Sequence, residues 1–134
     1  MLFNYVFFWG NWSKTWKVST VRTWLNNDFY NIAFSSVDKL LIKESQLEYT
    51  KDKIFLLSEY EVMSIFSLCI CIPTPYSKKI NYENATSDSC EWWLRSTGVN
   101  HYFCHVMHDN NIIEHRIFNY KAVRPAMRIN LKKL

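Results

Sequence analysis

The chain has 134 residues, of which 49% are hydrophobic and 17% aromatic, and its formal net charge is +4. A chain of this length and composition folds around one apolar core, so we expect a single domain over residues 1–134 and exclude a disordered chain. The mild positive charge, clustered only at the C-terminal end, excludes a typical nucleic-acid-binding protein, whose basic residues form a dense stripe.

The N-terminal segment does not resemble a targeting signal. Residues 1–9 are apolar apart from Asn4, but they lack the basic leading region and the small-residue cleavage site of a signal peptide. No apolar run approaches the roughly 20 residues that a membrane-spanning helix needs. We therefore expect a cytoplasmic protein without a membrane partner, unless a phage particle or a partner carries it elsewhere. The cysteines are expected to be mostly buried thiols, namely Cys69, Cys71, Cys90 and Cys104.

The N-terminal third of the sequence predicts a strand followed by two helices. Residues 1–16 are aromatic and strand-like. Ser19 or Thr20 can then cap an amphipathic helix that ends at residues 33–34, because apolar side chains recur at spacings of three and four residues; they are Val21, Trp24, Leu25, Phe29 and Ile32. Ser35 or Ser36 can cap a second helix that extends to Lys43, with an inward face of Val37, Leu40 and Leu41.

The middle of the chain predicts a short strand, a buried strand and a third helix. Residues 47–50 are expected to form the short strand, and Lys51-Asp52 a turn. The apolar run 53–57 predicts the buried strand. Ser58 and Glu61 match the capping box, in which each side chain bonds the other's backbone N–H. The third helix therefore begins at Ser58, and its buried residues are expected to be Val62, Ile65 and Phe66.

The C-terminal half predicts a long loop followed by antiparallel strands. Residues 76–89 are polar and form the longest expected loop. Residues 92–96 predict a strand, on which Trp92 and Leu94 face one side while Trp93 and Arg95 face the other. Residues 101–108 and 112–118 predict a hairpin joined by Asp109-Asn110-Asn111. Residues 123–131 predict a last strand, placed at an edge or bulge by Pro125.

Four motifs in this order resemble a bacterial and phage domain family of unassigned function. The family pattern is an S-x-x-R-x-W-L-N helix, an F-L-L-S-x-x-E step, a W-W-L-R-S strand and a terminal V-R-P-A strand. The matching residues here are Ser19, Arg22, Trp24, Leu25 and Asn26, then 55–58 with Glu61, then 92–96, and finally 123–126. The resemblance runs from about residue 16 to residue 131.

This family is similar in organisation to C-type-lectin-like folds and to the formylglycine-generating (sulfatase-modifying) enzymes. The resemblance implies an α+β fold in which two or three helices pack on small twisted antiparallel sheets, with long loops on one face. It also implies a scaffold for a variable binding surface, and it transfers no catalytic residues. Family members carry extra strands before the first helix, so this chain is expected to be shortened at its N-terminus. An exposed sheet edge there predicts a homodimer or a partner strand.

Six residues are candidate ligand contacts, because exposed aromatic rings stack on sugars and arginine binds carboxylates or phosphates. They are Trp92, Trp93, Arg95, Tyr76, Tyr82 and Arg124. Each has a structural alternative. The two tryptophans can belong to the core, and the two arginines can bind loop carbonyls or pair with Glu61 or Glu91.

Catalytic and metal sites have weaker support in the sequence. On a strand, His101 and His105 face one side while Cys104 and His108 face the other, which splits any zinc site. The spacing gives no support to a redox pair of Cys90 with Cys104, and no local signature supports a Ser96, His105 and Asp88 triad. Calcium ligands can be sought only in the loop, at Glu83, Asn84 and Asp88. We expect no catalytic residue, metal or cofactor.

The sequence therefore predicts a non-enzymatic domain that recognises a protein or glycan ligand. The expected binding face consists of residues 76–89 and the loops after Ser96 and Phe118. One alternative is a structural or assembly subunit, possibly of phage origin, that acts through a sheet edge. The other is an oxidase of the sulfatase-modifying type.

Overall fold

The computed structural model describes residues 6–7, 15–65, 71–75, 78, 89–98, 103–107, 109–115 and 121–134. The helical elements are η1 (Trp16–Val18), α1 (Thr20–Trp24), η2 (Leu25–Phe29), α2 (Tyr30–Ala33), α3 (Ser36–Leu41), α4 (Glu59–Ile65) and η3 (Leu131–Lys133). The strands are β1 (Val6–Phe7), β2 (Ile42–Lys43), β3 (Ser45–Gln46), β4 (Lys51–Asp52), β5 (Trp92–Thr97), β6 (Phe103–Val106), β7 (Ile112–His115), β8 (Lys121–Ala122) and β9 (Arg128–Ile129). The fold is α+β, as predicted.

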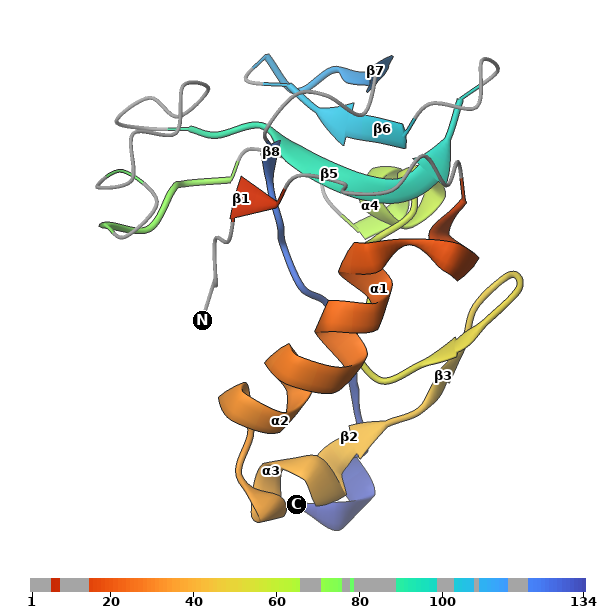
Figure 1. The fold of residues 1–134 in the computed structure, drawn as a ribbon, viewed down its shortest axis with the longest axis vertical. Coiled ribbons are helices and arrows are strands. Elements are labelled where there is room, and N and C mark those ends of the chain that lie inside the picture. The colour runs from red at the N-terminus through yellow and green to blue at the C-terminus, as the bar shows by residue number, and fades with distance from the viewer. Residues whose placement is uncertain are drawn as a thin grey trace.

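A five-stranded sheet with the order β1-β8-β5-β6-β7 forms one layer, and α1, α2 and α3 extend away from it (Figure 1). The β6–β7 hairpin confirms the predicted turn, in which Asn110 has φ 75° and Met107 N–H donates to Asn111 O. The sheet is mixed, because β5 and β8 are parallel. Two further sheets, β2-β9 and β3-β4, have two strands each.

Of the predicted last strand over residues 123–131, only β9 is a strand, and β8 ends just before this segment, at Ala122. β8 lies beside β5, whereas β9 pairs with β2 near the C-terminus (Figure 1). Between them, Ala126 makes a single bridge to Phe55. The prediction of one continuous strand over residues 123–131 was therefore wrong, because this segment crosses from one sheet to the other around Pro125.

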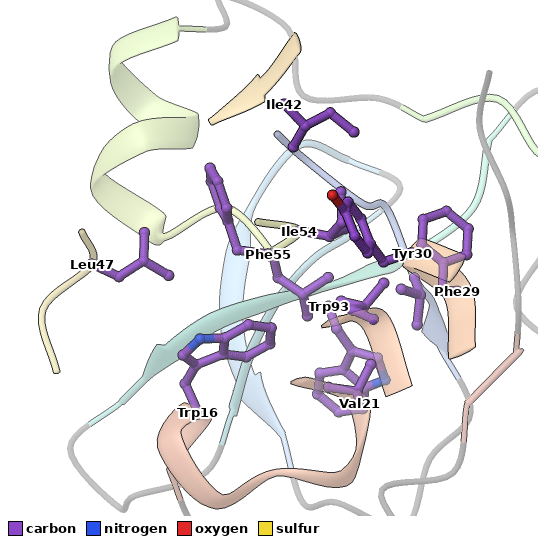
Figure 2. Packing of buried hydrophobic residues seen from close by; sticks show 12 residues of the cluster. Trp16, Val21, Phe29, Tyr30, Ile42, Leu47, Ile54, Phe55 and Trp93 are labelled. Atoms are coloured by element: carbon purple, nitrogen blue, oxygen red, sulfur yellow. The ribbon is translucent and has the colours of Figure 1, made fainter. Parts of the chain in front are cut away.

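Strand β5 is buried on both faces, and its alternation of side chains confirms the prediction for the W-W-L-R-S motif. Trp93 belongs to the helix core, which also contains Trp16, Val21, Leu25, Phe29, Tyr30, Ile42, Leu47, Ile54, Phe55, Leu56 and Val123 (Figure 2). Trp92 and Leu94 face the other way, into the cysteine core, with Val62, Cys71, Cys90, Cys104, Val106 and Ala122. The strand thus separates two apolar clusters.

The first helix begins as predicted and then changes its geometry. The Ser19 side chain accepts the Arg22 backbone N–H at 3.3 Å, so it is the N-cap, and Val21, Leu25 and Phe29 are buried. Residues 25–29 form a π-helical turn, whose hydrogen bonds close one residue later than those of an α-helix. The extra residue rotates the next segment, so Tyr30 is buried and Ile32 is 86% exposed. The prediction that Ile32 faces the core was therefore wrong.

The second helix is shorter than predicted. Ser35 and Asp38 form its capping box, and α3 ends at Leu41. Val37 and Leu40 are each 67% exposed, which contradicts their predicted inward orientation. The reason is position, because α3 lies at the end of the molecule beside β2 and η3 rather than across the sheet (Figure 1).

Around β3 and β4, the strand and the turn have exchanged places relative to the prediction. The strands are β3 and β4, and residues 47–50 form the turn, closed by Leu47 N–H donating to Thr50 O at 2.9 Å. Asp52 therefore lies on a strand and points inward. The predicted strand at 53–57 is buried, but within it only Phe55 makes a bridge.

The third helix, α4, confirms the predicted capping box. Ser58 N–H donates to Glu61 Oε2 at 2.9 Å, and Glu61 N–H donates to the Ser58 hydroxyl at 3.1 Å. Val62 is buried as predicted, whereas Ile65 is exposed. Phe66 lies outside the described residues.

Candidate functional site

Arg22 of the first family motif takes part in a hydrogen-bond network around Asp52, which is 2% exposed. Its carboxylate accepts the Trp16 indole N–H at 2.9 Å, the Thr50 hydroxyl at 2.6 Å and Arg22 Nε–H at 2.8 Å. Arg22 also donates to Lys17 O at 2.9 Å. The network ties η1 and α1 to the β3–β4 hairpin, so the arginine of this motif has a structural role.

Asn26, the last residue of that motif, joins the helix to the chain after β4. Its side-chain oxygen accepts the backbone N–H groups of Lys53 and Ile54 at 2.9 and 3.2 Å. Its amide group donates to Ile54 O at 2.8 Å. Asparagine is needed here because one side chain must both donate and accept. These bonds satisfy backbone groups in a segment that forms no regular strand.

Arg95 forms a second network at the C-terminal end of β5, where it is 6% exposed. Its Nε and Nη2 donate to the two Glu48 oxygens at 3.1 and 2.9 Å in a bidentate pair. Its Nη1 donates to Leu56 O at 2.7 Å and to Glu61 Oε2. Arg95 therefore connects β5, the β3–β4 hairpin and the start of α4. Arg95 therefore fits the structural alternative that was predicted for it, because it pairs with Glu61.

The two carboxylates bound by Arg95 have lowered pKa values. The Arg95 hydrogen bonds lower the pKa of Glu48 against a smaller effect of burial. Burial by itself raises the pKa of Glu61, but the bonds from Arg95 and Ser58 together outweigh it, so the pKa is lowered. Both groups are therefore held in the charged form that Arg95 requires.

Acid should weaken this network. A carboxylate whose pKa is lowered by folding stabilises the protein above its unfolded pKa, near 4.5, and that stability is lost as the pH falls through the folded value. We expect the free energy of unfolding, measured by urea denaturation from about pH 6 to about pH 3, to fall more for the native chain than for a variant with both Glu48→Gln and Glu61→Gln. Equal slopes would contradict this role of the carboxylates.

A pocket of about 290 Å³ lies next to both networks. Three segments distant in sequence form it: the entry to η1, the β3–β4 turn and the end of β5. Its lining residues are Thr15, Trp16, Lys17, Glu48, Tyr49, Thr50, Arg95, Ser96 and Thr97. Trp16, Thr50 and Arg95 are buried, whereas Tyr49 is 85% exposed. We call this hollow the Tyr49 pocket.

The chemistry of the Tyr49 pocket combines one exposed aromatic ring with hydroxyl groups and charges of both signs. Thr15, Thr50, Ser96 and Thr97 supply the hydroxyls. The Ser96 hydroxyl accepts Glu59 N–H at 2.9 Å, which leaves its own proton to donate. Lys17 and Glu48 add a positive and a negative charge at exposed positions. Such a lining suits a polar ligand with several hydroxyl groups.

Of the four predicted contact residues that the structure describes, Trp92, Trp93, Arg95 and Arg124, only Arg95 lines this pocket. Trp92 and Trp93 have no exposed surface, and their rings are part of the two apolar clusters. This is the structural alternative that was given for them. Arg124 is partly buried, with its guanidinium 4.9 Å from the Trp92 ring centre. Tyr76 and Tyr82 lie outside the described residues. Tyr49 and Lys17 were not predicted as contact residues. The signal that the sequence offers there is an aromatic residue, Tyr49, close to the predicted turn at Lys51-Asp52.

A buried ionic cluster spans three neighbouring strands at the other end of β5. Glu91, just before β5, pairs with Lys121 of β8, and His105 Nε2 of β6 lies 3.5 Å from Glu91 Oε2. His105 also packs edge-on against Trp93, with ring centres 5.6 Å apart. All three residues are buried. The cluster is thus enclosed within the sheet and connects its strands.

The described residues do not assemble the catalytic and metal sites considered from the sequence. Within the described ranges, no three His, Cys, Asp or Glu side chains converge to hold a metal. Cys104 lies in the cysteine core, whereas His105 packs on Trp93, so these neighbours face opposite sides as predicted. Cys90 makes an isolated backbone β-bridge with Cys71, not with Cys104. His101, His108, Glu83, Asn84 and Asp88 lie outside the described residues.

The structure defines an α+β domain with a pocket built on two polar networks, and the part of the chain that is described contains no helix of the length and apolarity that crossing a bilayer requires. The family model described as "Domain of unknown function (DUF6273)" matches residues 5–131, and the chain belongs to this family. The match confirms the predicted membership of a family of unassigned function. No curated protein and no solved structure gave a match.

Proposed function

We propose that this domain is a non-enzymatic recognition module that binds a glycan or a protein ligand at the Tyr49 pocket. The observation that carries the proposal is the lining of that pocket, in which an exposed tyrosine stands beside four hydroxyl-bearing side chains. Aromatic rings pack against the apolar faces of sugars, while hydroxyl and charged groups fix the orientation of the ligand. A glycan is the ligand class that uses both features.

The walls of the pocket support the same proposal. Trp16, Thr50 and Arg95 are held by the two networks, in which the Asp52 and Arg95 side chains are almost completely buried. A site whose walls are fixed before binding loses less conformational entropy when the ligand arrives. The family motifs therefore position a pocket whose exposed lining, at Lys17, Tyr49 and Thr97, makes the contacts.

Replacement of Tyr49 by alanine is expected to weaken ligand binding about tenfold, which corresponds to the loss of one aromatic contact. A glycan array probed with the native chain and with Tyr49→Ala measures this change. Tyr60→Ala is the matched control, because Tyr60 is 79% exposed but lies on α4 and does not line the pocket. An array that binds neither protein, or binds both equally, would contradict glycan binding at the Tyr49 pocket.

A structural or assembly role is the second candidate. β1 is a terminal strand of the described five-stranded sheet, where it pairs with β8. Such a strand can extend the sheet by pairing with a second copy of this chain. Multi-angle light scattering across a dilution series tests this. A stable dimer supports assembly through the edge, and a monomer at micromolar concentration argues against it.

We also propose that the fold is organised like that of C-type lectins. The support is the placement of α1 to α3 away from one side of a small sheet, together with two minor sheets (Figure 1). An experimental structure that includes residues 76–89 tests this, because a lectin-like domain displays its long loops on one face.

A further inference from the structure

Cys71 and Cys90 face each other in the cysteine core. They are partners in an antiparallel bridge, in which Cys90 N–H donates to Cys71 O at 2.8 Å. The Cys90 thiol also approaches that carbonyl oxygen, at 3.4 Å. Directly opposed residues of an antiparallel pair have Cα atoms about 4.5–5.5 Å apart, which falls within the range that a disulfide spans. The bridge therefore places two thiols where they can bond.

The two thiols differ in their electrostatic surroundings. The hydrogen bond with Cys90 and the charge of Arg124 lower the pKa of Cys71 to about 7, against the effect of burial. The same hydrogen bond, together with burial, raises the pKa of Cys90. Arg124 is held beside the pair by its contact with the Trp92 ring. One thiol is thus suited to act as a nucleophilic thiolate, and the other to remain a protonated reserve.

Cys104 provides an internal comparison within the same core. Burial and the charges of Glu59 and Glu114 raise its pKa to about 11. It is buried like the other two and is a free thiol in this structure. A buried thiol with a raised pKa is inert toward oxidants. Within the cysteine core, the β-bridge therefore sets Cys71 and Cys90 apart from Cys104.

We propose that Cys71 and Cys90 form a redox-active dithiol that hydrogen peroxide converts to an intramolecular disulfide. The Cys71 thiolate attacks one peroxide oxygen and breaks the O–O bond, which gives a sulfenic acid and hydroxide. The hydroxide combines with the proton that the Cys71 thiol released when it ionised, and becomes the first water molecule. The Cys90 thiol then attacks the Cys71 sulfur, its proton leaves with the sulfenic oxygen as water, and the S–S bond forms. Overall, two thiols are oxidised and one peroxide is reduced to two water molecules.

The disulfide would link the two ends of the segment between residues 71 and 90. That segment contains Tyr76 and Tyr82, and it leads directly into β5. A covalent link between its ends restricts the unfolded chain, so the oxidised protein should melt at a higher temperature than the reduced protein. A thiol reductant should reverse the change. Oxidation would thus set the stability of this part of the domain.

The test uses the full chain, reduced and then treated with hydrogen peroxide near pH 7. Mass spectrometry of the intact protein should show the loss of two hydrogen atoms, and peptide mapping without reduction should link Cys71 to Cys90. Cys104→Ser and Cys69→Ser should leave this product unchanged, whereas Cys90→Ser should give Cys71 sulfenic or sulfinic acid instead. The melting temperature of the oxidised native chain should rise and return after reduction.

Other results would overturn the inference. Oxidation first at Cys104, a link that includes Cys69 in place of either partner, or recovery of both thiols intact after peroxide treatment would each do so. The mapping on the native chain decides the matter even if a cysteine variant fails to fold. Arg124→Gln should slow formation of the disulfide, because the thiolate of Cys71 loses a nearby positive charge.

Discussion

Substitution of Arg95 by methionine is expected to lower the free energy of unfolding by about 3–5 kcal/mol, the range for breaking a buried ion pair from one side. The guanidinium donates to Glu48, Glu61 and Leu56 O. Methionine fills much of the same volume but leaves the Leu56 carbonyl and the Glu61 carboxylate without these donors. Urea denaturation at neutral pH measures the change.

Arg128→Met is the matched control for this prediction. Arg128 also approaches Glu61, at 3.5 Å, and its guanidinium lies over the same Phe55 ring as that of Arg95. Its side chain is 52% exposed, however, so its removal should cost at most about 1 kcal/mol. If the two variants lost similar stability, Arg95 would not have the structural role that its burial indicates.

Asp52→Ala is expected to destabilise the fold by a comparable amount, about 3–5 kcal/mol. The loss of the carboxylate removes the acceptor of Trp16, Thr50 and Arg22 together, and the first two donors are buried. Each buried donor left without a partner costs about 1–3 kcal/mol. Thermal and urea unfolding should both report the loss, and the indole environment of Trp16 should change in near-ultraviolet circular dichroism.

Asp38→Ala distinguishes this effect from the general loss of a hydrogen-bonded carboxylate. Asp38 accepts bonds from the Ser35 N–H and hydroxyl at 2.9 and 2.7 Å, but in an exposed capping box. Water can replace these bonds, so the loss of stability should be much smaller than for Asp52→Ala. If Asp52→Ala is no more destabilising than Asp38→Ala, burial of the Asp52 carboxylate and its three donors does not have the stabilising effect inferred here.

Local patterns predicted much of the fold. The alternation of Trp92 to Arg95 placed these residues on the correct faces, and the capping signals at Ser19, Ser35 and Ser58 marked true helix starts. These signals depend only on residues that are a few positions apart, so they can be recognised from the sequence. The π-helical turn was not predictable, because a shift of one residue within a helix has no clear sequence pattern.

The site was harder to predict because its partners are distant in the sequence. Asp52 looked like a turn residue, yet its role depends on Trp16 and Arg22, which are 36 and 30 residues away. Glu61 was named as a partner of Arg95, whereas Glu48, 47 residues away, was not. The Tyr49 pocket arises only when three such segments meet, and no one of them carries a binding motif.

We propose that residues of the family motifs hold a framework while the Tyr49 pocket recognises the ligand. A ¹H–¹⁵N correlation experiment, in which the native chain is titrated with a panel of neutral and acidic mono- and disaccharides, tests this claim most directly. We expect shifts of backbone amides in residues 15–17, 48–50 and 95–97, and the loss of these shifts in Tyr49→Ala. Shifts confined to other parts of the chain, or no shifts with any sugar, would contradict it.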